Sequence, residues 1–225
     1  MTDALRATRP DYPEIGEQLR ARRHALGLSL RTLADRLGVS PSLISQIERG
    51  RANPSVSTLY AIVAELDVSL DELLFTERRA TANRVAGPIQ RGNERHRIRL
   101  ASGVLWERLT TVSEPGVEFL YVIYEVGGAS SAEDAYQRHS GHEWGYVISG
   151  ELHVTIGFRE YVLEPGDSIS LDSTTPHRLA NHGDTPVHAI WFVLGRDGDD
   201  VDRRAPDDLE RRGGAGGRDE DARVP

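Results

Sequence analysis

The chain has 225 residues and a formal net charge of −8, and 38% of its residues are hydrophobic. This length suits one large domain or two small ones, and either can bury a core. The acidic balance argues against a protein that coats nucleic acid or anionic membranes non-specifically. The sequence contains no cysteine, which excludes disulfides and thiolate metal sites. No apolar run approaches the ~20 residues of a membrane span and the N-terminus lacks a signal-peptide core, so we expect a cytoplasmic protein with no membrane partner.

The first third of the chain has helical periodicity. A first helix is predicted to begin at Pro13, where a missing amide hydrogen is tolerated. The apolar stripe of the next helix consists of Leu30, Leu33, Ala34 and Leu37. Gly38 follows this stripe, at the position where a residue of left-handed conformation usually closes a helix.

A second short helix is predicted directly after this turn. Ser40 can cap it and Pro41 suits its first position. Ile44 and Ile47 are sufficient to dock it on the rest of the domain. Its remaining face is polar and carries Ser42, Ser45, Gln46 and Arg49. Two short helices around a tight turn, with one polar face left free, indicate a helix-turn-helix that places its second helix in a DNA groove.

The rest of the chain divides by composition. A fourth helix is expected from 54 to 66 and a short fifth one at 69–74, which completes an all-α five-helix domain over residues 13–75. Residues 76–97 are polar and patternless, as in a linker, and residues 196–225 have too few apolar side chains to order themselves, so we expect a disordered acidic tail. Residues 98–195 alternate with a period of two, which predicts an all-β antiparallel barrel or sandwich. Its β-rich runs are 104–112, 117–126, 144–148, 152–156 and 187–194.

The helical region resembles the helix-turn-helix domain of Xre- and phage-repressor-type regulators. The resemblance covers about residues 15–75 and includes the A-x-x-L-G-V-S turn, the I-x-x-I-E-R-G end and the N-P-S that follows. It implies that Ser42 and Gln46 approach base edges and that Leu43 meets a thymine methyl group, while arginines and capping amides meet phosphates. The residues that it assigns to double-stranded DNA are Arg31, Thr32, Ser40, Ser42, Leu43, Ser45, Gln46, Arg49, Arg51, Asn53 and Ser55.

The same region is electrically neutral. Residues 1–79 contain 11 arginines and 11 acidic residues, so DNA binding should depend on a few arginines and weaken steeply with salt. Leu30, where many relatives carry Gln, and Pro41, which has no side-chain donor, depart from the family in details of base readout. The alternative is a helical bundle that is used for protein contacts.

The β-rich region resembles the cupins in the stretches at 137–150 and 165–181. By position in the two cupin motifs, His139, Glu143 and His177 take the places of metal ligands, and Asn181 takes the closing place. Two imidazoles and one carboxylate suit Fe(II) and similar metals. Gln137 stands where the first histidine of the motif should be. Two interpretations therefore stay open: one divalent metal (Fe, Mn, Ni or Zn) bound by His139, Glu143, His177 and Gln137, or an eroded cupin without metal.

These two resemblances together imply a transcription regulator with a C-terminal cupin domain. Such regulators usually read inverted repeats, so we expect a homodimer on its operator and a small-molecule effector in the cupin domain. The candidate effector pocket consists of His142, Arg178 and Asn181. The alternative is an Fe(II)-dependent cupin oxygenase, like the phosphonate epoxidases, that carries a vestigial helix-turn-helix domain. In the regulator interpretation the chain is not an enzyme.

Overall fold

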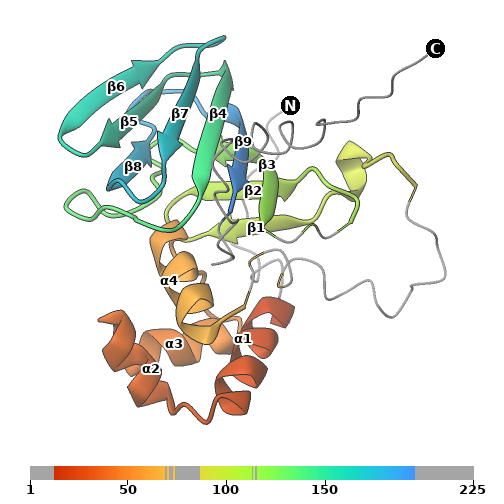
Figure 1. Ribbon diagram of the computed structural model, residues 1–225, viewed down its shortest axis with the longest axis vertical. Coiled ribbons are helices and arrows are strands. Elements are labelled where there is room, and N and C mark those ends of the chain that lie inside the picture. The colour runs from red at the N-terminus through yellow and green to blue at the C-terminus, as the bar shows by residue number, and fades with distance from the viewer. Residues whose placement is uncertain are drawn as a thin grey trace, which may run out of the picture.

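The computed structural model describes residues 13–68, 70, 73, 87–112, 114 and 116–195. α-Helices occupy the N-terminal part and strands most of the rest, so the predicted order of an all-α domain followed by an all-β domain is confirmed (Figure 1). Of the predicted fifth helix at 69–74 only Leu70 and Leu73 are described; both are helical and buried, while four α-helices are described over their full length. The predicted tail and most of the predicted linker lie outside the described residues.

The four α-helices described in full in the N-terminal region are α1 (Pro13–Ala25), α2 (Leu30–Leu37), α3 (Pro41–Glu48) and α4 (Val56–Leu66). Serine hydroxyls cap three of them, since Ser29, Ser40 and Ser55 accept hydrogen bonds from the backbone amides of the first turns of α2, α3 and α4. Gly38 ends α2 with a φ of 66°, a left-handed conformation that L residues with a side chain rarely adopt. The predicted turn chemistry of the helix-turn-helix is therefore present.

The helical core is small and contains one buried ion pair. Its largest fully buried side chains are Leu19, Leu33, Ile44, Val56, Leu59, Ile62 and Leu66. Arg23 on α1 bonds both carboxylate oxygens of Glu48 on α3, at 2.6 and 2.9 Å. The hydrogen bond to Glu48 raises the pKa of Arg23 above its ordinary value, against the opposing effect of burial, so the guanidinium stays charged at neutral pH. The pair therefore fixes α1 against the end of α3.

Within residues 87–195, the described part of the C-terminal region contains nine strands: β1 (Arg97–Leu100), β2 (Val104–Arg108), β3 (Val117–Tyr124), β4 (His142–Ser149), β5 (Leu152–Ile156), β6 (Arg159–Leu163), β7 (Ser168–Asp172), β8 (His177–Ala180) and β9 (Val187–Leu194). They form a six-stranded sheet in the order β1-β2-β3-β9-β4-β7 and a three-stranded sheet in the order β6-β5-β8. The five predicted β-rich runs correspond to β2, β3, β4, β5 and β9. The short strands β1, β6 and β7 were not predicted.

Strand alternation separates an inner from an outer face in the larger sheet. In β4, Glu143, Gly145 and Val147 are buried, whereas Trp144, Tyr146 and Ile148 are exposed. Gly145 is required because an added Cβ would lie 2.1 Å from the ring of Trp191 on β9. The inner face therefore holds the polar site residue Glu143 within an apolar core.

Helix α4 lies against the β region. The backbone amide of Ser57 donates to the carbonyl of Ser130 at 3.2 Å, and the amide of Ala101 donates to the carbonyl of Pro54 at 2.9 Å. Figure 1 shows α4 as the helix nearest the strands, with α2 at the far end of the helical region. Among the described residues no helix is long and apolar enough to cross a membrane.

Candidate functional site

The polar face of α3 is open to solvent. Ser42, Gln46 and Arg49 are exposed, while Ile44 and Ile47 on the other side of the helix are buried in the helical core. The side-chain amide of Gln46 donates to the hydroxyl of Ser42 at 3.3 Å, so the two groups assigned to base edges lie side by side. A helix that presents short polar side chains and is docked only by its apolar side has the form required for insertion into the major groove.

The other predicted DNA-contacting residues divide into exposed and structural positions. Arg31 and Arg51 are exposed. The hydroxyls of Ser40 and Ser55 are helix caps, and Thr32 contacts the hydroxyl of Ser29 at 2.7 Å. The remaining three, Leu43, Ser45 and Asn53, are half-buried.

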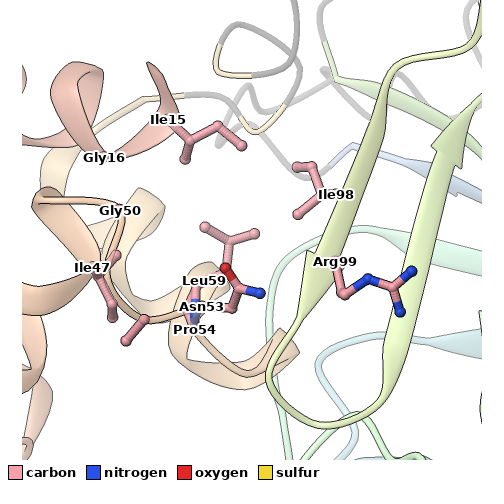
Figure 2. Close-up of a pocket in the computed structure, with 10 residues that line it drawn as sticks. Ile15, Gly16, Ile47, Gly50, Asn53, Pro54, Leu59, Ile98 and Arg99 are labelled. Atoms are coloured by element: carbon pink, nitrogen blue, oxygen red, sulfur yellow. The ribbon is translucent and has the colours of Figure 1, made fainter. Parts of the chain in front are cut away.

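Asn53 lies beside a small cavity between the helices and β1. The cavity measures about 30 Å³, and Figure 2 shows Ile15 on the helical side of it and Ile98 on the β1 side. The same view shows the guanidinium of Arg99 directed away from the helices. The cavity has room for about two waters at most, so it is a packing gap between the two regions.

A second site lies on the inner face of the β region, where three predicted metal ligands converge. Glu143 Oε1 is 2.7 Å from His139 Nε2 and 3.2 Å from His177 Nε2. One ligand atom from each of the three residues lies within 4.8 Å of the others. Glu143 comes from β4 and His177 from β8, whereas His139 lies in the loop before β4. The fold therefore brings together residues that lie up to 38 positions apart in the sequence, from His139 to His177.

Backbone carbonyls fix the orientation of both imidazoles. His139 Nδ1 is 2.9 Å from the carbonyl oxygen of Ser140, and His177 Nδ1 is 2.8 Å from that of Thr175. Since a carbonyl oxygen can only accept, each Nδ1 carries the hydrogen and each neutral ring has its lone pair on Nε2. Both lone pairs face the carboxylate of Glu143, and a cation among these atoms, either a proton or a metal ion, would offset their mutual repulsion.

The carboxylate of Glu143 is held from its other side. Trp191 Nε1 on β9 donates to Glu143 Oε2 at 2.5 Å. Burial, and to a smaller extent the charge of Glu143, raises the pKa of the neighbouring Tyr124, which therefore stays neutral beside the carboxylate. The carboxylate thus has one oxygen bound to the indole and the other directed at the two histidines.

The residues present fit a metal ion. Ligand atoms about 2.1 Å from an ion and at right angles to each other lie about 3 Å apart, close to the separations between Glu143 and the two histidines. Gln137 is bridged to His177 through their backbones. Its side-chain oxygen is buried and accepts no hydrogen bond from the described residues. Gln137 therefore offers a side-chain oxygen without a described donor at the position where the cupin motif has its first histidine.

The three residues predicted to line an effector pocket do not line the cavities next to the triad. His142 lies on the outer side of β4, where its ring centroid is 4.6 Å from that of Trp144. Arg178 donates to the carbonyls of Ser131 and Ala132. The buried side-chain amide of Asn181 donates to three backbone carbonyls and tethers the start of β9 to the end of β3.

Two cavities lined by described residues adjoin the triad, and sequence reasoning missed that helix α4 contributes to both. One, of about 20 Å³, lies inside the barrel and is lined by Glu143, Gln137 and Trp191 together with Val56 and Tyr60 of α4. The other, of about 320 Å³, lies between α4 and the loop at 136–140. Tyr60 could not be recognised from its helical periodicity, since that pattern shows which face is buried but not what buries it.

Comparison with known proteins agrees with this architecture. A "Helix-turn-helix" family model matches residues 19–73 and a "Cupin domain" model matches residues 115–193. The HTH-type transcriptional regulator PuuR of Escherichia coli is 28% identical over 166 residues, which are 74% of this chain and 86% of PuuR. The regulator SutR of the same organism is 25% identical over 174 residues, 76% of this chain and 88% of SutR.

Among solved structures, an HTH_3 family transcriptional regulator from Vibrio cholerae matches with a TM-score of 0.58 and 20% identity, over 81% of this chain and 95% of that one. At that identity the likeness shows the fold alone. The order of the two matched domains is the order of the described helices and strands. The chain therefore carries a helix-turn-helix domain of the HTH_3 (Xre) type followed by a cupin domain, and the relatives that share this order are named HTH-type transcriptional regulators.

Proposed function

We propose that this DNA-binding regulator reads its operator with α3, and that the cupin domain controls this binding through a metal ion and a small molecule. The observation that carries the proposal is the exposed face of Ser42, Gln46 and Arg49, on a helix whose Ile44 and Ile47 are buried. A ligand regulates only if it binds one arrangement of the protein more tightly than another. The contact between α4 and the cupin domain supplies a physical route for such a difference.

Base readout is tested with DNA from upstream of the protein's own coding sequence. In a gel-retardation titration, Gln46→Ala should weaken binding to the preferred sequence by about 1–3 kcal/mol, because a bidentate contact to a base edge is lost. Binding to a scrambled duplex should hardly change. Arg159→Ala, at an exposed position on β6, is the matched surface control. Equal weakening on both duplexes would assign Gln46 to the phosphate backbone and contradict the proposed reading face.

The metal proposed for the cupin site is a single divalent ion, Fe, Mn, Ni or Zn. His139, Glu143 and His177 would hold it, with the side-chain oxygen of Gln137 as a fourth ligand. Imidazole and carboxylate suit these metals, whereas the absence of thiolates makes the site unsuitable for soft ions. When bound, the ion would supply a fixed positive charge that orients the two imidazoles and the carboxylate. Metal analysis of protein purified without chelator identifies the ion.

We further propose a homodimer, formed through the outer face of the larger sheet. Trp144, Tyr146 and Ile148 on β4 are each between 41% and 48% exposed. Trp144 pairs across the strands with Phe192 of β9, which in turn pairs with Phe119 of β3. Three aromatic rings in contact across three strands form an exposed apolar patch of the kind that marks protein interfaces. A two-fold dimer would also match an inverted-repeat operator with half-sites ~34 Å apart.

Sedimentation velocity tests the dimer. The double variant Trp144→Ser, Tyr146→Ser should shift the protein from dimer to monomer. Val162→Ser, at a position of similar exposure on β6, should leave the dimer unchanged. A dimer that persists in the double variant would rule out this face.

The triad also supports a second candidate, an Fe(II)-dependent oxygenase. Two histidines and one carboxylate leave coordination positions open, and a cavity reaches His139. The exposed face of α3 favours the regulator, since catalysis alone does not need it. If the iron-loaded protein consumes oxygen steadily and His139→Ala does not, the chain would be an oxygenase and not a regulator alone.

A further inference from the structure

The cavity between α4 and the β region has one apolar and one polar wall. α4 and the residues that follow it supply Ala61, Val63, Ala64, Val68 and Leu70. The loop before β4 supplies the polar residues from Tyr136 to Ser140. At about 320 Å³ the cavity has the size of small-molecule sites. The void inside the barrel, at about 20 Å³, has room for only about one water. A ligand larger than water therefore fits between the two regions and not inside the barrel.

The charge of the lining points to an anion. Arg138 is exposed, and it has no hydrogen-bond or ion-pair partner among the described residues. Among the described residues that line this cavity, none has an acidic side chain. A guanidinium binds a carboxylate through two parallel hydrogen bonds, a geometry that a neutral amide cannot reproduce. Ala61 and Ala64 are solvent-exposed small residues of α4 that leave space for an apolar group opposite this charge.

We propose that this cavity binds a small carboxylic acid with an apolar body, which is the effector of the protein. The carboxylate pairs with Arg138, and the apolar body lies on Ala61 and Ala64. This inference rests on the proposed function, because it identifies the site and the chemical class of the molecule that controls DNA binding.

The position of the cavity explains how its occupant acts on the helices. One side of α4 lines the cavity, while Leu59, Ile62 and Leu66 on its other side are fully buried. Tyr60 and Gln137 line both this cavity and the void beside Glu143. An occupant therefore contacts the helix that completes the helical core and the loop that carries His139. By linkage, a ligand that favours one placement of α4 changes DNA affinity, and DNA changes the affinity for the ligand equally.

The test measures binding of hexanoate and hexanamide to the full chain by titration calorimetry, without DNA. The two probes have the same shape and differ in charge. The wild-type chain should bind hexanoate at least about tenfold more tightly than hexanamide, since one charge-assisted pair is worth about that factor. Arg138→Gln should remove this preference, and Arg159→Gln should retain it. Ala64→Phe should abolish binding of both probes by filling the apolar end of the cavity.

Three results would overturn the inference: equal affinity of the wild-type chain for acid and amide, no binding of either, or hexanoate binding that is unchanged in both Arg138→Gln and Ala64→Phe. Positions 64 and 138 are exposed, and a thermal unfolding curve checks that each variant is folded. Gel retardation by the wild-type chain without probe tests the proposed regulator separately. A chain that retards its DNA but binds neither probe would refute this inference alone.

Discussion

The hydroxyl of Tyr60 on α4 donates a hydrogen bond of 3.1 Å to the carboxylate of Glu118 on β3. The two residues are 58 positions apart, and both are buried. The ring of Tyr60 also lies 5.4 Å from that of Trp106 and 5.2 Å from that of His139, measured between centroids. One side chain of the helical region therefore contacts the sheet, the core of the β region and a metal-ligand candidate.

Tyr60→Phe should destabilise the protein by about 1.5–3 kcal/mol, the usual contribution of a buried hydrogen bond to a charged group. The ring contacts with Trp106 and His139 are retained, so the loss reports the hydroxyl alone. Urea denaturation followed by tryptophan fluorescence measures the free energy of unfolding. Tyr146→Phe, at an exposed position on β4, is the control and should leave it unchanged. Equal stability of the two variants would show that Tyr60 does not hold α4 on the sheet.

Gly16 on α1 packs directly against the end of α3. A Cβ at this position would lie 2.5 Å from the carbonyl oxygen of Ile47 and 2.8 Å from that of Glu48. On an exposed helix Gly→Ala would gain up to about 1 kcal/mol of helix propensity. Here the contact is with backbone, which cannot rotate away, so we expect Gly16→Ala to cost about 1–3 kcal/mol instead.

Thermal and urea unfolding measure this cost, and Gly92→Ala is the control. An added Cβ at Gly92 would meet nothing closer than 3.9 Å. A stabilised Gly16→Ala variant would mean that α1 and α3 are less closely packed than described. Loss of DNA binding in a folded Gly16→Ala variant would show in addition that this packing sets the position of α3.

Local signals predicted the helix-turn-helix and the triad well. The cap at Ser40, the left-handed turn at Gly38 and the buried pair Ile44 and Ile47 each depend on a few neighbouring residues, so the sequence is sufficient to find them. The spacing of His139 and Glu143 and their distant partner His177 matched a motif, and the three side chains do converge.

Features that depend on tertiary contacts escaped prediction. Glu48 reads as a polar helix residue, and only its partner 25 positions earlier explains why it is buried. Asn181 was assigned to an effector pocket, but its amide is bonded to backbone carbonyls that no spacing rule identifies. The strands β6 and β7 have mostly exposed residues, so their weak alternation gave no signal. Prediction of the contact between Tyr60 and the β region would have required the relative position of the two domains.

Removal of one imidazole should abolish metal binding. With three protein ligands of suitable type, His139→Ala or His177→Ala leaves an incomplete site, and we expect metal content to fall at least about tenfold. His142→Ala should keep the metal, since that ring packs against Trp144 on the outer side of β4. Elemental analysis after exhaustive dialysis makes the comparison.

Trp191→Phe tests whether the hydrogen bond from the indole of Trp191 to Glu143 contributes to metal binding. The indole holds one oxygen of Glu143, and loss of such a supporting hydrogen bond typically weakens metal binding by about 10–100-fold. Metal affinity from a competitive chelator titration gives the value.

Metal content that is the same in His139→Ala as in the wild type would place the ion elsewhere and remove the triad as its site.

Arg49 should supply one phosphate contact. Arg49 is exposed at the end of α3. Residues 1–79 contain 11 arginines and 11 acidic residues, so few unbalanced cations are available to displace counterions from DNA. Arg49→Ala should therefore weaken binding to all duplexes alike and reduce the slope of log Kobs against log salt by about 1. Fluorescence anisotropy of a labelled operator between low and moderate salt gives both numbers. Ser42→Ala is the informative comparison, because it removes a neutral group and should alter sequence preference with the salt slope unchanged. If Arg49→Ala left the slope as it is in the wild type, the phosphate backbone would have to run past another part of α3, and the docking proposed here would be wrong.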